Sequence, residues 1–160
     1  MKIKNILAPT DFSENAQVAF EKAYDLAQQL GAKLFVLHVR DESNLRIAIK
    51  EGLLEADITD EQLEEAVKNL TEERFANLLG SVDGSQVAIE HISRRGDSGA
   101  TILSYAKEIG ADIIVIGRHG AGVMESILSA VLGSVAETLI KKSPCPVLVT
   151  RRDHKTVKSE

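Results

Sequence analysis

The sequence has a single cysteine and no long apolar run. Cys145 has no partner for an intrachain disulfide, which excludes a disulfide-stapled fold and indicates a reducing compartment. The apolar residues before Pro9 are too few for a signal peptide, and no stretch is long enough to cross a membrane. We therefore expect a cytoplasmic protein with no membrane partner.

The sequence also lacks an excess of positive charge. Its formal net charge is −5, which argues against a nucleic-acid-binding surface as its main function. It has no P-loop and no nucleophile elbow, and the first strand–helix turn, Ala8 to Asp11, lacks the G-x-G-x-x-G of dinucleotide enzymes. No Cys/His spacing fits zinc, and no catalytic set can be placed. A dedicated enzyme is therefore poorly supported.

Short apolar runs alternate with helical patterns through most of the 160 residues. We expect strands at 3–8, 34–39, 86–92, 113–116 and 147–150, with helices between them. This alternation predicts an α/β fold with one doubly wound, five-stranded parallel sheet and helices on both faces. We expect one domain, residues 1–152, followed by a polar tail, residues 153–160.

Two features of the middle of the chain carry predictions. Thr59 and Gln62 form a capping box, and the helix that follows should bury Leu63, Leu70 and other residues at helical spacing before it stops at Gly80. Residues 40–58 carry a weak mixed pattern after the second strand, and we predict a mobile flap there.

Glycines gather after the strand at 113–116 and before the last helix. Gly117 and Gly120 follow the strand, and Gly133 with Ser134 stands at the head of a helical pattern. Glycine leaves backbone N–H groups unobstructed, and a helix N-terminus adds the positive end of its dipole. Both features favour a bound phosphate.

These glycines resemble the nucleotide-binding signature G-x2-G-x9-G-[S/T] of the universal stress protein family. The opening residues 5–39 and the closing residues 143–151 also resemble that family, whereas residues 41–92 carry no matching motif. The resemblance implies the strand order 3-2-1-4-5 and ATP as the ligand, with or without Mg²⁺. One departure is clear, because twelve residues rather than nine separate Gly120 from Gly133. An added helical turn within 123–132 would accommodate the extra three.

The predicted binding residues follow from the sheet's carboxyl edge and from the resemblance. They are Pro9, Thr10, Asp11, Val39, Ile116, Gly117, Arg118, His119, Gly120, Gly133, Ser134, Val135 and Ala136. Asp11 either binds the ribose or base or caps the helix that follows, and Ser13 is the other candidate for that cap. Ser134 is either an N-cap or a phosphate ligand. The resemblance implies that the Val39 backbone contacts adenine. His38, inside an apolar strand, is expected to be a satisfied core histidine.

The resemblance implies an ATP-binding regulator of stress responses that acts through nucleotide-dependent conformation or an unidentified protein partner. At most it would hydrolyse ATP slowly. Two alternatives stay open: an interaction module of the same family without nucleotide, and an enzyme of the wider nucleotide-binding α/β class. The apolar last strand, Val147 to Val149, would be an edge strand. We expect two copies of the protein to form a homodimer by pairing these strands.

Overall fold

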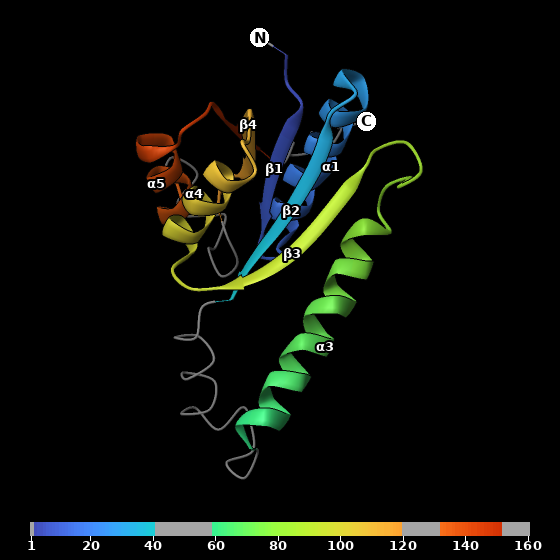
Figure 1. The fold of residues 1–160 in the computed structure, drawn as a ribbon, viewed down its shortest axis with the longest axis vertical. Coiled ribbons are helices and arrows are strands. Elements are labelled where there is room, and N and C mark those ends of the chain that lie inside the picture. Colours follow the sequence, from blue (N-terminus) through green and yellow to red (C-terminus); the bar gives the residue numbers. More distant parts are fainter. Residues whose placement is uncertain (1, 41–58, 120–131, 152–160) are drawn as a thin grey trace, which may run out of the picture.

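Five strands form one parallel sheet at the centre of the molecule (Figure 1). The strands are β1 (Asn5–Thr10), β2 (Lys33–Arg40), β3 (Ile89–Arg95), β4 (Ile113–Gly117) and β5 (Val147–Thr150). Their order is β3-β2-β1-β4-β5, and every neighbouring pair is parallel. The α/β class, the strand order and the edge position of β5 that the sequence and the resemblance predicted are therefore confirmed.

The structure is a computed structural model that describes residues 2–40, 59–119 and 132–151. Several expectations fall outside these residues. They are the flap after Arg40, the added helical turn before Leu132, the position of Gly120 and the polar tail at 153–160.

Four helices in the described residues cover the two faces of the sheet. They are α1 (Glu14–Leu30), α3 (Asp60–Leu79), α4 (Ser98–Glu108) and α5 (Ser134–Lys142). Because side chains alternate along a strand, each strand contributes to two separate cores. One core joins Ile6, Ala8, Leu34, Val36 and Val115 to α1 and α3, and the other joins Leu7, Leu37, Ile114 and Ile116 to α4 and α5.

Helix α1 packs closely because its buried face consists largely of alanine. Ala19, Ala23 and Ala27 are buried, and Phe20 fills the space between them and the sheet. Small side chains let the helix backbone approach the strands. The helix ends at Gly31 in a left-handed conformation with φ 62°, which favours glycine.

Strand β1 continues through Pro9 to Thr10, two residues beyond its predicted end. The backbone groups of successive residues in β1 point in turn to β2 and to β4. The bond from Lys33 N to Lys4 O shows that the backbone groups of even-numbered residues point to β2. Pro9 therefore faces β4, whose pairing with β1 ends at Leu7. A missing N–H has no consequence there, so the strand continues through Pro9 and its predicted end at residue 8 was wrong.

Of the stripe that the sequence predicted for α3, which runs from Leu63 to Leu78, only Leu78 is buried. The capping box between Thr59 and Gln62 is confirmed, but the buried residues are Thr71, Phe75 and Leu78, and Leu70 is 46% exposed. Figure 1 shows the reason, because α3 runs beside β3 and its first turns extend past the strands. Only the last turns have a sheet beneath them.

Candidate functional site

The end of β4 and the start of α5 are joined by a backbone hydrogen bond. Gly133 N donates to Arg118 O over 3.0 Å. This bond brings the residue after the strand and the residue before the helix together, whatever the length of chain between them. The departure from the nine-residue family spacing therefore does not separate Gly117 from Ser134.

The N-terminus of α5 presents backbone donors. Gly133 is the N-cap residue, with φ −65° and ψ 152°, and no side chain caps the helix. The first intrahelical bond runs from Glu137 N to Gly133 O, so the N–H groups of Ser134, Val135 and Ala136 precede it. Ser134 is thus the first helical residue, and of its two expected roles the N-cap role is excluded.

The turn from β1 to α1 is fixed by its own side chains. Thr10 Oγ1 accepts from Phe12 N and Asp11 Oδ1 accepts from Ser13 N, each over 3.0 Å. Ser13 Oγ then accepts from Ala16 N and is the N-cap of α1. Phe12 adopts a left-handed conformation with φ 61°, which is costly for a bulky residue. Asp11 is therefore not the helix cap.

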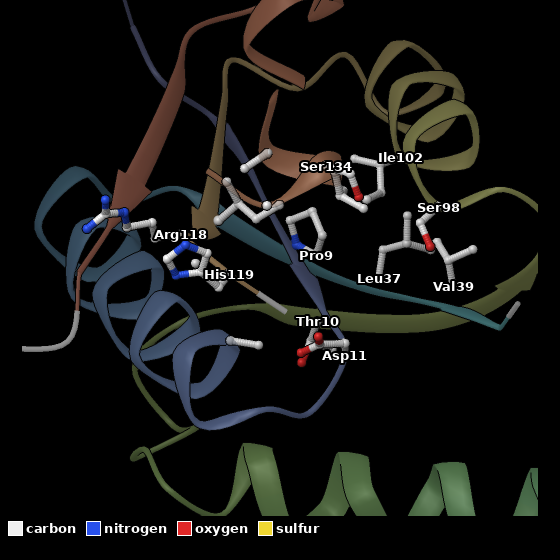
Figure 2. A pocket seen from close by; sticks show the side chains of 16 residues that line it. Pro9, Thr10, Asp11, Leu37, Val39, Ser98, Ile102, Arg118, His119 and Ser134 are labelled. Carbon is white, nitrogen blue, oxygen red and sulfur yellow. The ribbon is translucent and has the colours of Figure 1, made fainter. Parts of the chain in front are cut away.

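These segments surround one cavity of about 490 Å³ at the carboxyl edge of the sheet (Figure 2). Every predicted binding residue that the structure describes lines it. Four lining residues were not predicted from the sequence: Ala16, Leu37, Ser98 and Ile102. Ala16, Leu37 and Ile102 belong to apolar helix and strand patterns that indicate residues of the hydrophobic core. Ser98 could have been found, because it follows a strand and begins a helix at the sheet edge where ligands bind.

The cavity has two chemically different ends. Leu37, Val39 and Ile102 give one end apolar walls, and Figure 2 shows Ser98 at that end. Gly117 and the start of α5, with its uncapped first N–H groups, also line the cavity. Arg118 and His119 also line the cavity, and Figure 2 shows them away from Val39. An elongated ligand with a flat apolar part and an anionic part fits this division.

His38 supports the cavity from the opposite face of the sheet. Its Nδ1 lies 2.9 Å from Thr10 O, and its ring stacks on Phe12 at 4.6 Å between centroids. Phe12 in turn meets Phe75 of α3 edge-on at 5.1 Å. Burial lowers the pKa of His38, against the opposing effect of the Thr10 carbonyl. The expectation that His38 is satisfied is confirmed, although the residue is half-buried rather than in the core.

Metal sites and membrane-spanning helices are both absent from residues 2–40, 59–119 and 132–151. Within these ranges no three His, Cys, Asp or Glu side chains come together as a metal site. No helix in the same ranges is long and apolar enough to cross a membrane.

Solved structures similar to this chain share its fold. The structure of the protein MJ0577 gives a TM-score of 0.75 at 29% identity, over 96% of this chain and 99% of that one. UspA from Lactobacillus plantarum gives 0.67 at 29% identity, over 94% and 99%. Two universal stress proteins solved with cAMP and, from Archaeoglobus fulgidus, with dAMP give 0.59 and 0.61 at 20% and 21% identity. They cover 94% of this chain and 98% and 100% of their own. The last two likenesses show the fold alone.

Sequence comparison gives the family. Universal stress protein MJ0577 of Methanocaldococcus jannaschii is 34% identical over 157 residues, which are 93% of this chain and 95% of the relative. The sequence model of the universal stress protein family matches residues 2–151. The chain belongs to the universal stress protein family.

Proposed function

We propose that this protein is a nucleotide-binding regulator whose ligand is ATP, held in the cavity between β1, β2, β4 and α5. The base would occupy the apolar end and the phosphates the end formed by Gly117 and α5. Universal stress proteins of the same fold have been solved with cAMP and with dAMP, so other members of the family hold adenine nucleotides. This supports a nucleotide as the class of ligand, and the cavity's own chemistry supports ATP.

The observation that carries the proposal is the bond from Gly133 N to Arg118 O. It holds the start of α5 against the end of β4, and the residues with the first N–H groups of α5 line the cavity. Several converging backbone donors and a helix dipole are what a polyphosphate requires. Magnesium would bind through phosphate oxygens, because the described residues offer no carboxylate cluster for it.

The apolar end supports adenine as the base. Arg40 O accepts from Gly96 N and therefore faces β3. Since backbone groups alternate along a strand, those of Val39 face the other side, where β1 has ended at Thr10. The Val39 carbonyl is then an acceptor at the cavity for an exocyclic amino group. Adenine presents such a group, whereas guanine presents a carbonyl at the same ring position.

Calorimetry with a matched pair of variants tests the proposal. Ser134→Asp puts a negative charge at the first position of α5, which favours the helix but repels phosphate. Ser134→Asn is similar in size and neutral. We expect ATP to bind the wild type, to bind Ser134→Asn comparably, and to bind Ser134→Asp at least about tenfold more weakly, a loss of about 1.4 kcal/mol. Titrations with Mg²⁺ and with EDTA would show whether the metal accompanies the nucleotide.

The lengthened segment between Gly120 and Gly133 favours a second candidate, an interaction module of the same family that binds no nucleotide. In that case the wild type would bind no ATP at millimolar concentration. If ATP does bind, occupancy is the mechanism we propose for regulation: the nucleotide would favour one conformation, and a protein partner would bind that conformation.

A further inference from the structure

Ser98 is a polar side chain at the apolar end of the cavity. It begins α4 and lines the cavity together with Leu37, Val39 and Ile102 (Figure 2). Ser98 is half-buried, and among the described residues no hydrogen bond joins its hydroxyl to the protein. A hydroxyl can both donate and accept, so this end of the cavity has one adaptable polar group on a mostly apolar wall.

Helix capping does not account for this serine. Serine at the start of a helix is usually a cap, but here Asp97 is the N-cap residue. Its Oδ1 accepts from Ala100 N over 2.8 Å, and its carbonyl accepts from Thr101 N over 2.9 Å. The Ser98 hydroxyl therefore has no role in starting α4.

The starts of α4 and α5 are held at a fixed separation. Gly99 is buried, and a Cβ at that position would lie 3.0 Å from Thr138 Cγ2 of α5. Thr138 Oγ1 donates to Ser134 O over 2.9 Å, which ties this contact to the first residue of α5. The starts of α4 and α5, and with them Ser98 and Ser134, are therefore positioned by packing that does not depend on a ligand.

We propose that the Ser98 hydroxyl reads the base of the bound nucleotide by donating to a ring nitrogen beside its amino group. The inference rests on the proposed function. Adenine presents an amino donor next to a ring-nitrogen acceptor, which matches the Val39 carbonyl and a donating Ser98. Guanine presents a carbonyl where adenine has the amino group, so its oxygen would oppose the Val39 carbonyl. Ser98 is then a specificity-determining residue for adenine.

Calorimetry with three probes, ATP, GTP and inorganic triphosphate, tests this role. Ser98→Ala should weaken ATP about five- to tenfold, which is the loss of one hydrogen bond, and should reduce the preference for ATP over GTP. Binding of inorganic triphosphate should not change, because it has no base. Ser98→Thr keeps the hydroxyl and should retain most of the ATP affinity. Ser104→Ala, an exposed serine of the same helix, is the matched control and should bind as the wild type does.

The outcomes separate this inference from the proposed function. ATP affinity unchanged in Ser98→Ala, with Ser134→Asp still weakened, would overturn the role of Ser98 and leave the nucleotide site standing. Equal losses of ATP and triphosphate in Ser98→Ala would also overturn it, because the substitution would then act on the helix rather than on the base. A wild type that binds triphosphate and ATP equally would also overturn the role of Ser98, because the base would then add nothing to the affinity. No binding of any probe to the wild type would overturn both proposals.

Discussion

His38 connects the ligand end of β1 to the helices on the far face of the sheet. It holds Thr10 O with one ring nitrogen and packs on Phe12, the residue with φ 61° that shapes the turn carrying Asp11. The charged groups that act on it are Arg74 and Arg40, which lower its pKa, and Asp11, which raises it. Burial is the largest influence, and the net effect is a lowered pKa.

This lowered pKa predicts a pH dependence of stability. The unfolded chain takes up the His38 proton near pH 6.5, whereas the folded chain takes it up at lower pH. Between these values the unfolded state binds more protons, so the free energy of unfolding falls as the pH falls, by at most about 1.4 kcal/mol per pH unit. Urea unfolding from pH 7.5 to 5 should show this decline in the wild type and a shallower one in His38→Gln.

The matched control for this prediction is His91→Gln. His91 also stacks on Phe75, at 4.7 Å, but it is exposed and lies near Glu72. Its substitution controls for the loss of an imidazole that packs on Phe75 but does not contact Thr10 or Phe12. Identical pH profiles for His38→Gln and the wild type would contradict the assignment.

The contact between α1 and β4 depends on Gly117. A Cβ at Gly117 would lie 2.8 Å from the backbone oxygen of Asn15 in α1, and a backbone atom cannot move aside as a side chain can. We predict that Gly117→Ala lowers the free energy of unfolding by about 1–3 kcal/mol. Gly84→Ala is the control, since nothing lies within 4 Å of a Cβ there. Equal stability of the two variants in urea would refute the prediction.

This packing role makes Gly117 a poor probe of phosphate binding. A bulky residue at Gly117 would obstruct a phosphate near the backbone. In the structure the same substitution first displaces α1, so any loss of ATP affinity would have two causes. Ser134 is the cleaner position, because its substitutions leave α1 and β4 untouched.

Helix α3 offers a test of which of its faces carries stability. Phe75 is fully buried and contacts Phe12 and His91, whereas Leu70 is 46% exposed. We predict that Phe75→Ala costs about 3–5 kcal/mol and that Leu70→Ser changes stability by less than about 0.5 kcal/mol. Denaturant unfolding of the two variants measures both. A larger loss for Leu70→Ser than for Phe75→Ala would mean that the sequence pattern, with Leu70 in the core, is right after all.

At the scale of the whole molecule, the sequence predicted the architecture well because strand burial follows from composition. The runs at β2 and β4 are apolar on both faces, which only a central strand of a parallel sheet requires. The buried stripe of α3 could not be predicted in the same way, since it depends on which turns of the helix extend past the sheet. Ser98 could have been predicted from its place between a strand and a helix, but its position beside Val39 and Ile102 in the cavity depends on how β2 and α4 come together.

The last strand carries a prediction about assembly. β5 lies at the sheet edge, and Leu148 is 43% exposed there, while Val147 and Val149 pack against the core. Ile140 of α5 is another large exposed apolar side chain. An apolar edge strand offers unpaired backbone groups that a second copy can pair with antiparallel, and a two-fold axis makes this pairing self-complementary. We therefore predict a homodimer formed through β5.

Light scattering with size exclusion measures this assembly directly. Leu148→Glu should shift the mass from two chains to one while the circular dichroism spectrum stays the same, because Leu148 faces away from the core. Val149→Asp would be a poorer test, since Val149 packs on the core and its loss would also unfold the edge. Leu30→Glu is the matched control: Leu30 is 44% exposed at the end of α1, away from β5, and its variant should remain a dimer. A wild type with the mass of one chain at high micromolar concentration would rule the dimer out, and the exposed edge would then need a different partner.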